Sequence, residues 1–311
     1  MIPKKISPKA IDLFAGCGGL SLGFQQAGFE IVGFIEQWKP AIKTHLKNFP
    51  ESKHIGLDIT QVTEQDLEEY KEKIDVIIGG PPCQGFSICG KRNPFDKRNT
   101  LYKEFLRIVE IIKPKYIVME NVKGILSMKT PEGQPVINTL LNDFIKLGYL
   151  ICYKTLRAVD YGVAQKRERV IVIGKKCNYY PRPTTPTPIN TIEAIQDIPE
   201  KISGQLYSQN KPETIERIKQ LKQGERLCKT FNFSRQRIYA DKPSPTIATK
   251  QRLIHPYKHR FLTPREIARL QSFPDTFEFC GTLSNMIKQI GNAVPPKLAE
   301  AVAKNIFTEV K

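Results

Sequence analysis

The residue best suited to chemistry in this sequence is a cysteine behind two prolines, Cys83 in the stretch GGPPCQGFS. The apolar run DVII, residues 75–78, precedes it and predicts a short buried strand. Because open α/β sheets bind ligands at the carboxyl ends of their strands, Cys83 would lie at a ligand-binding edge. The prolines fix φ near about −65°, so the loop has a stiff entry. A lone cysteine is usually a small core residue, but in a loop after two prolines exposure is favoured over burial.

Other side chains suited to chemistry would share that edge. The motif MENV places Glu120 at the end of a predicted strand, residues 116–120. The motif QKRER begins a later strand, in which alternate side chains share one face. These alternate side chains are Gln165, Arg167 and Arg169. The thiol and the carboxylate would therefore face one pocket.

A second cluster of signals predicts a nucleotide-type cofactor. The stretch DLFAGCGGLSLGF runs from a strand into a glycine-rich turn and then a helix, whose amino terminus attracts anionic groups. Glu36, at the end of the next strand, could accept both hydroxyls of a ribose, and Asp58 would follow a third strand near an adenine amino group. A capping role for Asp58 and a solvated position for Glu36 are the structural alternatives. NAD and S-adenosylmethionine both satisfy these signals.

The elements that carry these residues alternate along the first half of the chain. Short runs rich in Val, Ile and Phe predict strands at 9–14, 30–36, 75–78, 116–120 and 167–174. Helical spacing lies between them, for example in Leu101, Phe105, Ile108 and Ile112, and Pro114 ends that run. This alternation predicts an α/β domain with a doubly wound, mostly parallel sheet.

The character of the chain changes after residue 174. From Cys177 to about Tyr239 the sequence has many prolines and scattered charges, with one helical stretch near PETIERIKQLKQ. This composition predicts a second, smaller, loop-rich domain. At the end of the chain, PPKLAEAVAKNIF predicts a helix that begins at proline and places Leu298, Val302 and Ile306 on one side.

Composition narrows the class of protein. The chain has 311 residues, 40% of them hydrophobic, and a formal net charge of +17. Such an excess indicates a polyanionic partner, nucleic acid before an acidic membrane surface, although a lysine-rich solvated surface would give the same number. The 7 cysteines are odd in number, which favours reduced thiols in the cytoplasm over disulfides. They form no CxxC pair, and we expect no metal site. No signal peptide or membrane-spanning run is present in the sequence.

Six motifs in order resemble those of the DNA (cytosine-5)-methyltransferases of compact bacterial type. They are DLFAGCGGLSLGF, GGPPCQGFS, ENV, QKRERV, RFLTPREIARLQSFPD and QIGNAVPP. The resemblance covers the chain except about residues 177–239. It implies a Rossmann-like fold, S-adenosylmethionine as cofactor and double-stranded DNA as substrate. It also implies a catalytic and cofactor domain at 1–175, a small domain at 176–284 with target recognition at about 177–239, and a returning segment at 285–311.

The resemblance implies roles for the catalytic candidates. Cys83 would attack C6 of a cytosine extruded from the duplex, which makes C5 nucleophilic. Glu120 would hold the N3 edge of the base, and Arg167 would contact O2 and favour the thiolate, with Gln165 and Arg169 alongside. Ser87, in a basic loop spanning residues 84–99, would fill the gap left in the duplex. The base that removes the C5 proton is not identified.

The cofactor contacts implied by the resemblance are Phe14, Ala15, Gly16, Gly18, Gly19, Glu36, Trp38, Asp58, Ile59, Pro81, Asn292 and Val294. One position departs from the family pattern. An apolar residue often follows the ribose acid, whereas this chain has Gln37 there and Trp38 next, which would stack on adenine from a shifted position.

The predicted small domain would read the DNA sequence. In FSRQRI, Arg235 and Arg237 are spaced to point the same way, and arginine pairs with guanine in the major groove. Contact of both with phosphates is an equal alternative. Methylation of tRNA, a catalytically silent DNA-binding relative and a nicotinamide oxidoreductase are the other functions considered. We expect a monomer, acting alone or beside a restriction endonuclease that shares its site without a stable complex.

Overall fold

The computed structural model describes residues 7–82, 101–130, 133–175, 181–185, 187–227, 235–249 and 252–310, with the backbone alone at 309 and 310. Cys83, Ser87 and the basic loop at 84–99 lie outside the described residues, so the predicted exposure of the thiol is not tested. Every structural statement below concerns the described residues.

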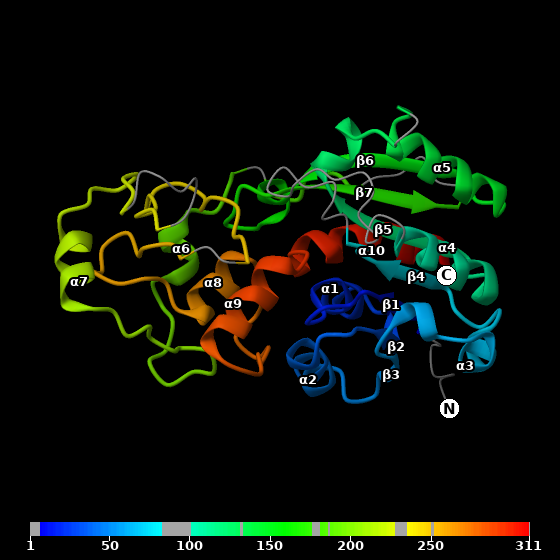
Figure 1. Cartoon of the computed structure of the whole chain (residues 1–311). Coiled ribbons are helices and arrows are strands. Elements are labelled where there is room, and N and C mark those ends of the chain that lie inside the picture. Colours follow the sequence, from blue (N-terminus) through cyan, green and yellow to red (C-terminus); the bar gives the residue numbers. More distant parts are fainter. Residues whose placement is uncertain are drawn as a thin grey trace.

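A seven-stranded sheet forms the larger part of the molecule, in the order β3-β2-β1-β4-β5-β7-β6 (Figure 1). Its strands are β1 (Lys9–Leu13), β2 (Glu30–Ile35), β3 (Lys53–Gly56), β4 (Val76–Gly79), β5 (Tyr116–Val122), β6 (Ile151–Arg157) and β7 (Glu168–Gly174). Strands β1 to β5 are parallel, and β7 runs antiparallel to both of its neighbours. The predicted doubly wound, mostly parallel α/β fold is confirmed.

Helices cover both faces of this sheet. They are α1 (Gly19–Gln26), α2 (Lys39–Asn48), α3 (Glu64–Leu67), α4 (Leu101–Ile112), α5 (Val136–Lys146) and α10 (Pro296–Val310). Alternate strand residues enter two separate cores, one shared with α1 and α10 and the other with α4 and α5. The predicted helix at Leu101 to Ile112 is confirmed, and its Phe105, Ile108 and Ile112 are fully buried.

The edge strand β6 was not predicted from the sequence. Its residues are mostly exposed or half-buried, with Tyr153 and Lys154 among the exposed ones, so no clean apolar alternation marks it. Strand β7 pairs with it over its whole length and separates it from β5. An edge strand with one neighbour needs less apolar surface than a central strand, which explains the weak signal.

The C-terminal helix α10 returns to the first part of the chain and crosses α1. Gly23 permits this crossing, since a Cβ there would lie 2.4 Å from the Cβ of Ala299 and 2.6 Å from the carbonyl of Pro296. The predicted helix that begins at proline is confirmed, and its Leu298, Val302 and Ile306 are buried.

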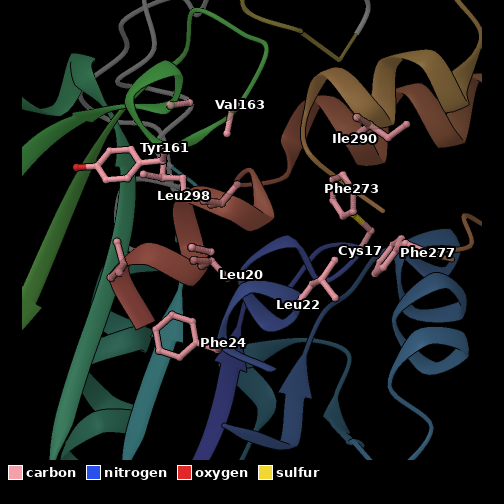
Figure 2. Close-up of a cluster of buried hydrophobic side chains, with 14 of the residues drawn as sticks. Cys17, Leu20, Leu22, Phe24, Tyr161, Val163, Phe273, Phe277, Ile290 and Leu298 are labelled. Carbon is pink, nitrogen blue, oxygen red and sulfur yellow. The ribbon is translucent and has the colours of Figure 1, made fainter. Parts of the chain in front are cut away.

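Helices α6 (Thr191–Ile195), α7 (Pro212–Lys219), α8 (Pro264–Leu270) and α9 (Leu283–Asn292) lie beside the sheet rather than on its faces (Figure 1). We call the described part of residues 181–292 the small lobe. One hydrophobic cluster runs from α1 into this lobe, as Figure 2 shows for Cys17, Phe277 and Ile290. The two parts therefore share a core.

Buried arginines stabilise the loop-rich small lobe. Loops leave carbonyl groups without ladder partners, and a guanidinium can satisfy several of them at once. Arg265 is 0% exposed and donates to the carbonyls of Ser203, Pro274 and Phe277 at 2.8, 2.9 and 2.7 Å. Arg237 is 3% exposed and does the same for four carbonyls, those of Ile218, His255, Pro256 and Lys258.

The expectation that Arg235 and Arg237 point the same way is wrong. Arg235 is exposed and has φ of 67°, in the left-handed region, whereas Arg237 is buried in the lobe. The left-handed residue breaks the extended alternation on which the prediction rested. Arg237 is committed to the carbonyls of its own lobe and is not placed to contact a base.

Candidate active site

A pocket of about 390 Å³ opens at the carboxyl edge of the parallel strands. Its walls come from the segments that follow β1, β2 and β4, from the end of β5, from the start of β7 and the residues just before it, and from residues 288–294. Because β7 is reversed, its first residues meet the same edge at which the parallel strands end. This volume suits a ligand of ordinary cofactor size.

Glu120 and Arg169 form an ion pair in this pocket. The Oε1 atom of Glu120 lies 2.6 Å from Nε of Arg169, and the two side chains are 12% and 13% exposed. Strand pairing places Arg169 opposite Val122, so Glu120, two residues earlier on β5, is its diagonal neighbour on the same face. Gly80 leaves room for the acid, because a Cβ there would be 3.1 Å from Oε2.

Arg167 also lines the pocket, but its guanidinium is 1% exposed and holds backbone of the small lobe and the C-terminal segment. It donates to the carbonyls of Ile247, Gly291 and Ala293 at 3.1, 3.1 and 2.9 Å. Burial and then repulsion by Arg169 lower the pKa of Arg167, and Glu120 acts in the opposite direction. The predicted contact of Arg167 with a base conflicts with this geometry, in which Arg169 is the partner of Glu120.

Gln165 lies behind the pocket wall and not in it. Its side chain is 0% exposed, accepts from the amide of Ile247 at 2.9 Å, and donates to the side chain of Gln271. Gln271 in turn donates to the carbonyl of Ala293 at 2.7 Å. Residues 165 and 167 precede β7 instead of belonging to it, and their side chains join the sheet to the small lobe.

The three glycines of the turn have different roles. Gly16 has φ of 57° and lines the pocket, and among the described residues a Cβ there would meet nothing within 4 Å. A Cβ on Gly18 would lie 2.5 Å from the ring of Phe49, and one on Gly19 would lie 2.4 Å from the carbonyl of Val294. Gly16 and Gly19 both line the pocket, whereas Gly18 does not and permits packing against Phe49. Phe14, before the turn, also has positive φ, 61°.

Glu36 connects two walls of the pocket. Its carboxylate accepts from the amides of Gly16 and Trp38 at 2.8 and 2.7 Å. Each oxygen keeps a further lone pair for a donor in the pocket. Glu36 is half-buried there and not a solvated surface residue.

Asp58 and Ile59 do not line the pocket. Asp58 is the N-cap of a short 3-10 helix, Ile59–Gln61, and accepts from the amide and hydroxyl of Thr60 at 3.0 and 2.8 Å. This is the capping alternative that the sequence left open. Ile59 is buried against the core that contains α4.

Trp38 and Lys288 meet at one end of the pocket. The Nζ atom of Lys288, on α9, lies 4.2 Å from the centre of the Trp38 ring, a cation–π distance. Lys288 was not predicted, because the residues are 250 positions apart and no local pattern joins them. The chain has a single tryptophan, so its fluorescence reports on this pocket.

The remaining predicted cofactor residues lie where expected in the pocket wall. Ala15, Pro81, Asn292 and Val294 all line it. Asn121 donates from its side chain to the carbonyl of Pro81 at 3.4 Å, two residues before Cys83. The end of β5 thus contacts the proline pair that leads to the predicted nucleophile.

In the described ranges, no helix is long and apolar enough to cross a membrane. The same ranges hold no group of three or more His, Cys, Asp or Glu side chains arranged to bind a metal ion.

The seven-stranded sheet with one reversed strand, the glycine turn after β1 and the acid after β2 agree with the S-adenosylmethionine-dependent methyltransferase class that the sequence motifs resemble. Residues 8–308 match the family model described as C-5 cytosine-specific DNA methylase. The chain is 36% identical to the type II methyltransferase M.DdeI of Desulfomicrobium norvegicum, over 95% of this chain and 88% of that protein. It is 35% identical to M.XorII of Xanthomonas oryzae pv. oryzae, over 98% and 85%.

Solved structures agree with this result. A DNA modification methyltransferase encoded within an E. coli prophage aligns with a TM-score of 0.82 and 32% identity, over 97% of this chain and 99% of that one. The Dnmt2 methyltransferase of S. pombe aligns with a TM-score of 0.67 at 18% identity, a likeness of fold alone, over 96% and 97%. The chain belongs to the C-5 cytosine-specific DNA methylase family, whose members use S-adenosylmethionine.

Proposed function

We propose that this enzyme methylates C5 of a cytosine extruded from double-stranded DNA, through a covalent bond between Cys83 and C6. The observation that carries the proposal is the Glu120–Arg169 ion pair at the carboxyl edge of the sheet. Pro81 and Pro82 line the same pocket and lead directly to Cys83. A largely buried, paired carboxylate can hold a base edge and share a proton with it.

Arg169, rather than Arg167, is the better candidate for contact with O2 of the base. Its Nε atom already orients the Glu120 carboxylate, and its side chain is part of the pocket wall. The end groups of Arg167 are occupied by three carbonyls of the chain. We assign to Arg167 and Gln165 the role of holding the small lobe and the C-terminal segment against the sheet.

The pocket fits S-adenosylmethionine, which supplies an electrophilic methyl group when bound. Gly16 offers open space and Glu36 offers a carboxylate for ribose hydroxyls. Trp38 offers an aromatic face for adenine, although Lys288 covers one side of its ring. Asn292 and Val294 would close the methionine side.

Glu36→Ala is expected to weaken S-adenosylmethionine binding by about 10-fold or more, since hydrogen bonds to a charged group contribute about 1.5–3 kcal/mol. The variant also removes the acceptor of the Gly16 and Trp38 amides. Calorimetry and quenching of Trp38 fluorescence measure the affinity without DNA. Asp58→Ala is the matched control and should bind the cofactor normally. An unchanged affinity for Glu36→Ala would place the ribose elsewhere.

Base recognition is proposed for the small lobe, with Arg235 as a candidate. Arg235→Ala is expected to relax specificity at one base pair by about 1–3 kcal/mol. Arg237→Ala should instead lower the free energy of unfolding by about 2–4 kcal/mol, because it leaves buried carbonyls unpaired. Competition binding with single-base variants at two salt concentrations tests the first claim, and denaturant unfolding tests the second. An even loss across all sequences for Arg235→Ala would indicate phosphate contact.

A sequence-specific role in restriction-modification or solitary methylation follows from the similarity to type II methyltransferases. Bisulfite sequencing of DNA from a methylation-free host that expresses this chain would show the site and the methylated cytosine. Parallel assays on duplex DNA and on tRNA separate the proposal from RNA methylation. Transfer to tRNA alone would refute DNA as the substrate.

A further inference from the structure

A buried chain of polar side chains lies beneath the glycine turn and takes no part in the pocket wall. Asp12 of β1, Ser21 of α1 and His45 of α2 are each 0% exposed. The Oγ atom of Ser21 lies 2.6 Å from Oδ2 of Asp12 and 3.1 Å from Nε2 of His45. Three elements that supply the cofactor pocket are thus joined through one hydroxyl group.

The single hydrogen of that hydroxyl restricts the proton positions. If Ser21 donates to Asp12, then Nε2 of His45 must donate to Ser21. If Ser21 donates to His45, then Asp12 must be protonated and donate to Ser21. In the described part of the chain, Oδ1 of Asp12 and Nδ1 of His45 are buried without partners. If Asp12 or His45 were ionised, few hydrogen bonds would therefore offset the free-energy cost of burying the charge.

The surroundings of the chain disfavour charge. Burial raises the pKa of Asp12 to about 7, against the hydrogen bond from Ser21, and Glu36 raises it further. Burial lowers the pKa of His45 to about 3, with repulsion from His54 acting the same way. Cys17 is the other titratable group facing this site. Between about pH 4 and 6.5 these pKa shifts favour the uncharged form of both Asp12 and His45.

The same side chains support the turn directly. The ring of His45 stacks on Phe34 with centroids 3.8 Å apart, and lies 4.6 Å from Phe49. A Cβ on Gly18, the N-cap of α1, would come within 3.1 Å of His45. The helix that carries His45 begins next to Trp38 in the pocket.

We propose that Asp12, Ser21 and His45 are positioning residues of the cofactor site, whose hydrogen-bonded chain holds the glycine turn and α2 in register. The inference rests on the proposed function, because it concerns the same pocket. None of the three lines the pocket. They act through Gly18, which lies against His45, and through the first turn of α1, which carries Ser21. Loss of the chain should raise the dissociation constant of the cofactor and leave the chemical step intact.

Ser21→Ala is expected to raise the dissociation constant for S-adenosylmethionine about 5- to 10-fold, with kcat at saturating cofactor within twofold of wild type. His45→Phe keeps the ring stacking and should show the same split. Asp12→Asn keeps an acceptor for Ser21 and should stay within twofold in both quantities. Ser52→Ala is the matched control, since Ser52 is a buried serine whose hydroxyl has no partner in the described residues.

The pH dependence of stability is an independent readout. Between about pH 4 and 6.5 the native chain holds one proton on Asp12 that the unfolded chain releases, and lacks one on His45 that the unfolded chain binds. The two effects cancel in the wild type. Relative to wild type, Asp12→Asn should lose stability as pH falls through this range, and His45→Phe should lose stability as pH rises through it. In each variant the folding equilibrium constant should change by up to about tenfold per pH unit.

Both readouts use the full chain, with Trp38 fluorescence for cofactor affinity in the absence of DNA and denaturant unfolding at pH 4.5 to 7. Failure of the wild type to bind S-adenosylmethionine would contradict the proposed function itself. If the wild type binds and folded Ser21→Ala binds equally well, the positioning role is wrong. The positioning role would also be overturned if kcat fell in parallel with cofactor affinity, or if Asp12→Asn lost as much affinity as Ser21→Ala. Stability that changes with pH in the same direction in Asp12→Asn and His45→Phe would overturn it as well.

Discussion

Replacing Cys83 by serine is expected to lower methyl transfer by at least ~10³-fold while folding and cofactor binding persist. A free thiol has a pKa of about 8.5, so roughly a few per cent is thiolate at pH 7, whereas a serine hydroxyl is almost wholly protonated. Sulfur is also the better leaving group when the covalent bond to C6 breaks. The variant therefore impairs both formation and collapse of the adduct.

Transfer of a labelled methyl group to duplex DNA measures the rate for Cys83→Ser. Duplex DNA carrying 5-fluorocytosine tests the covalent bond between Cys83 and C6. A base can remove hydrogen from C5 as a proton but cannot remove fluorine in this way, so the covalent adduct should persist and survive denaturation. Cys152→Ser, on the edge strand β6, is the control for loss of a thiol remote from the pocket. Methyl transfer by Cys83→Ser within tenfold of wild type would rule out the covalent mechanism.

The sequence was sufficient to predict most strands of the sheet, though not β6, and the edge at which the site lies. Strands are predicted from residues that are adjacent in sequence. Because ligands bind at the carboxyl ends of strands in open α/β sheets, the predicted strands also indicate where the site lies. The sequence also predicted that Glu120 lies at the end of a strand and faces the pocket, because Glu120 directly follows an apolar run. These successes depend on neighbours within a few residues along the chain.

The wrong prediction for Arg167 concerns contacts between residues that are distant in sequence. Which arginine meets Glu120 depends on where β7 begins, at Glu168, and on carbonyls at Ile247 and Gly291 that hold Arg167. Both contacts are about 80 residues or more from Arg167 in sequence, and no periodicity encodes them. The contact of Asp58 is local, because its partner Thr60 is only two residues later. Capping by Asp58 could therefore be named from the sequence as an alternative.

Glu120→Gln is expected to slow methyl transfer by about 10²-fold or more while DNA affinity changes by less than about threefold. Glutamine keeps an oxygen that can accept from Nε of Arg169, so the 2.6 Å contact and the local packing can persist. Its amide cannot share a proton with N3 of the base, and positioned proton transfer contributes about 10²–10⁴-fold. The loss should therefore fall on the rate and not on binding.

The matched control for Glu120→Gln is Glu168→Gln, which removes one negative charge from the neighbouring strand. Glu168 pairs with Lys123 at 3.0 Å outside the pocket and is 42% exposed, so its loss should leave the rate unchanged. Single-turnover methylation and DNA binding without cofactor are measured for both variants. If rate and DNA affinity fall in parallel for Glu120→Gln, the carboxylate only contacts the base. In that case the stabilisation of the C6 adduct must come from Arg169, the other member of the ion pair.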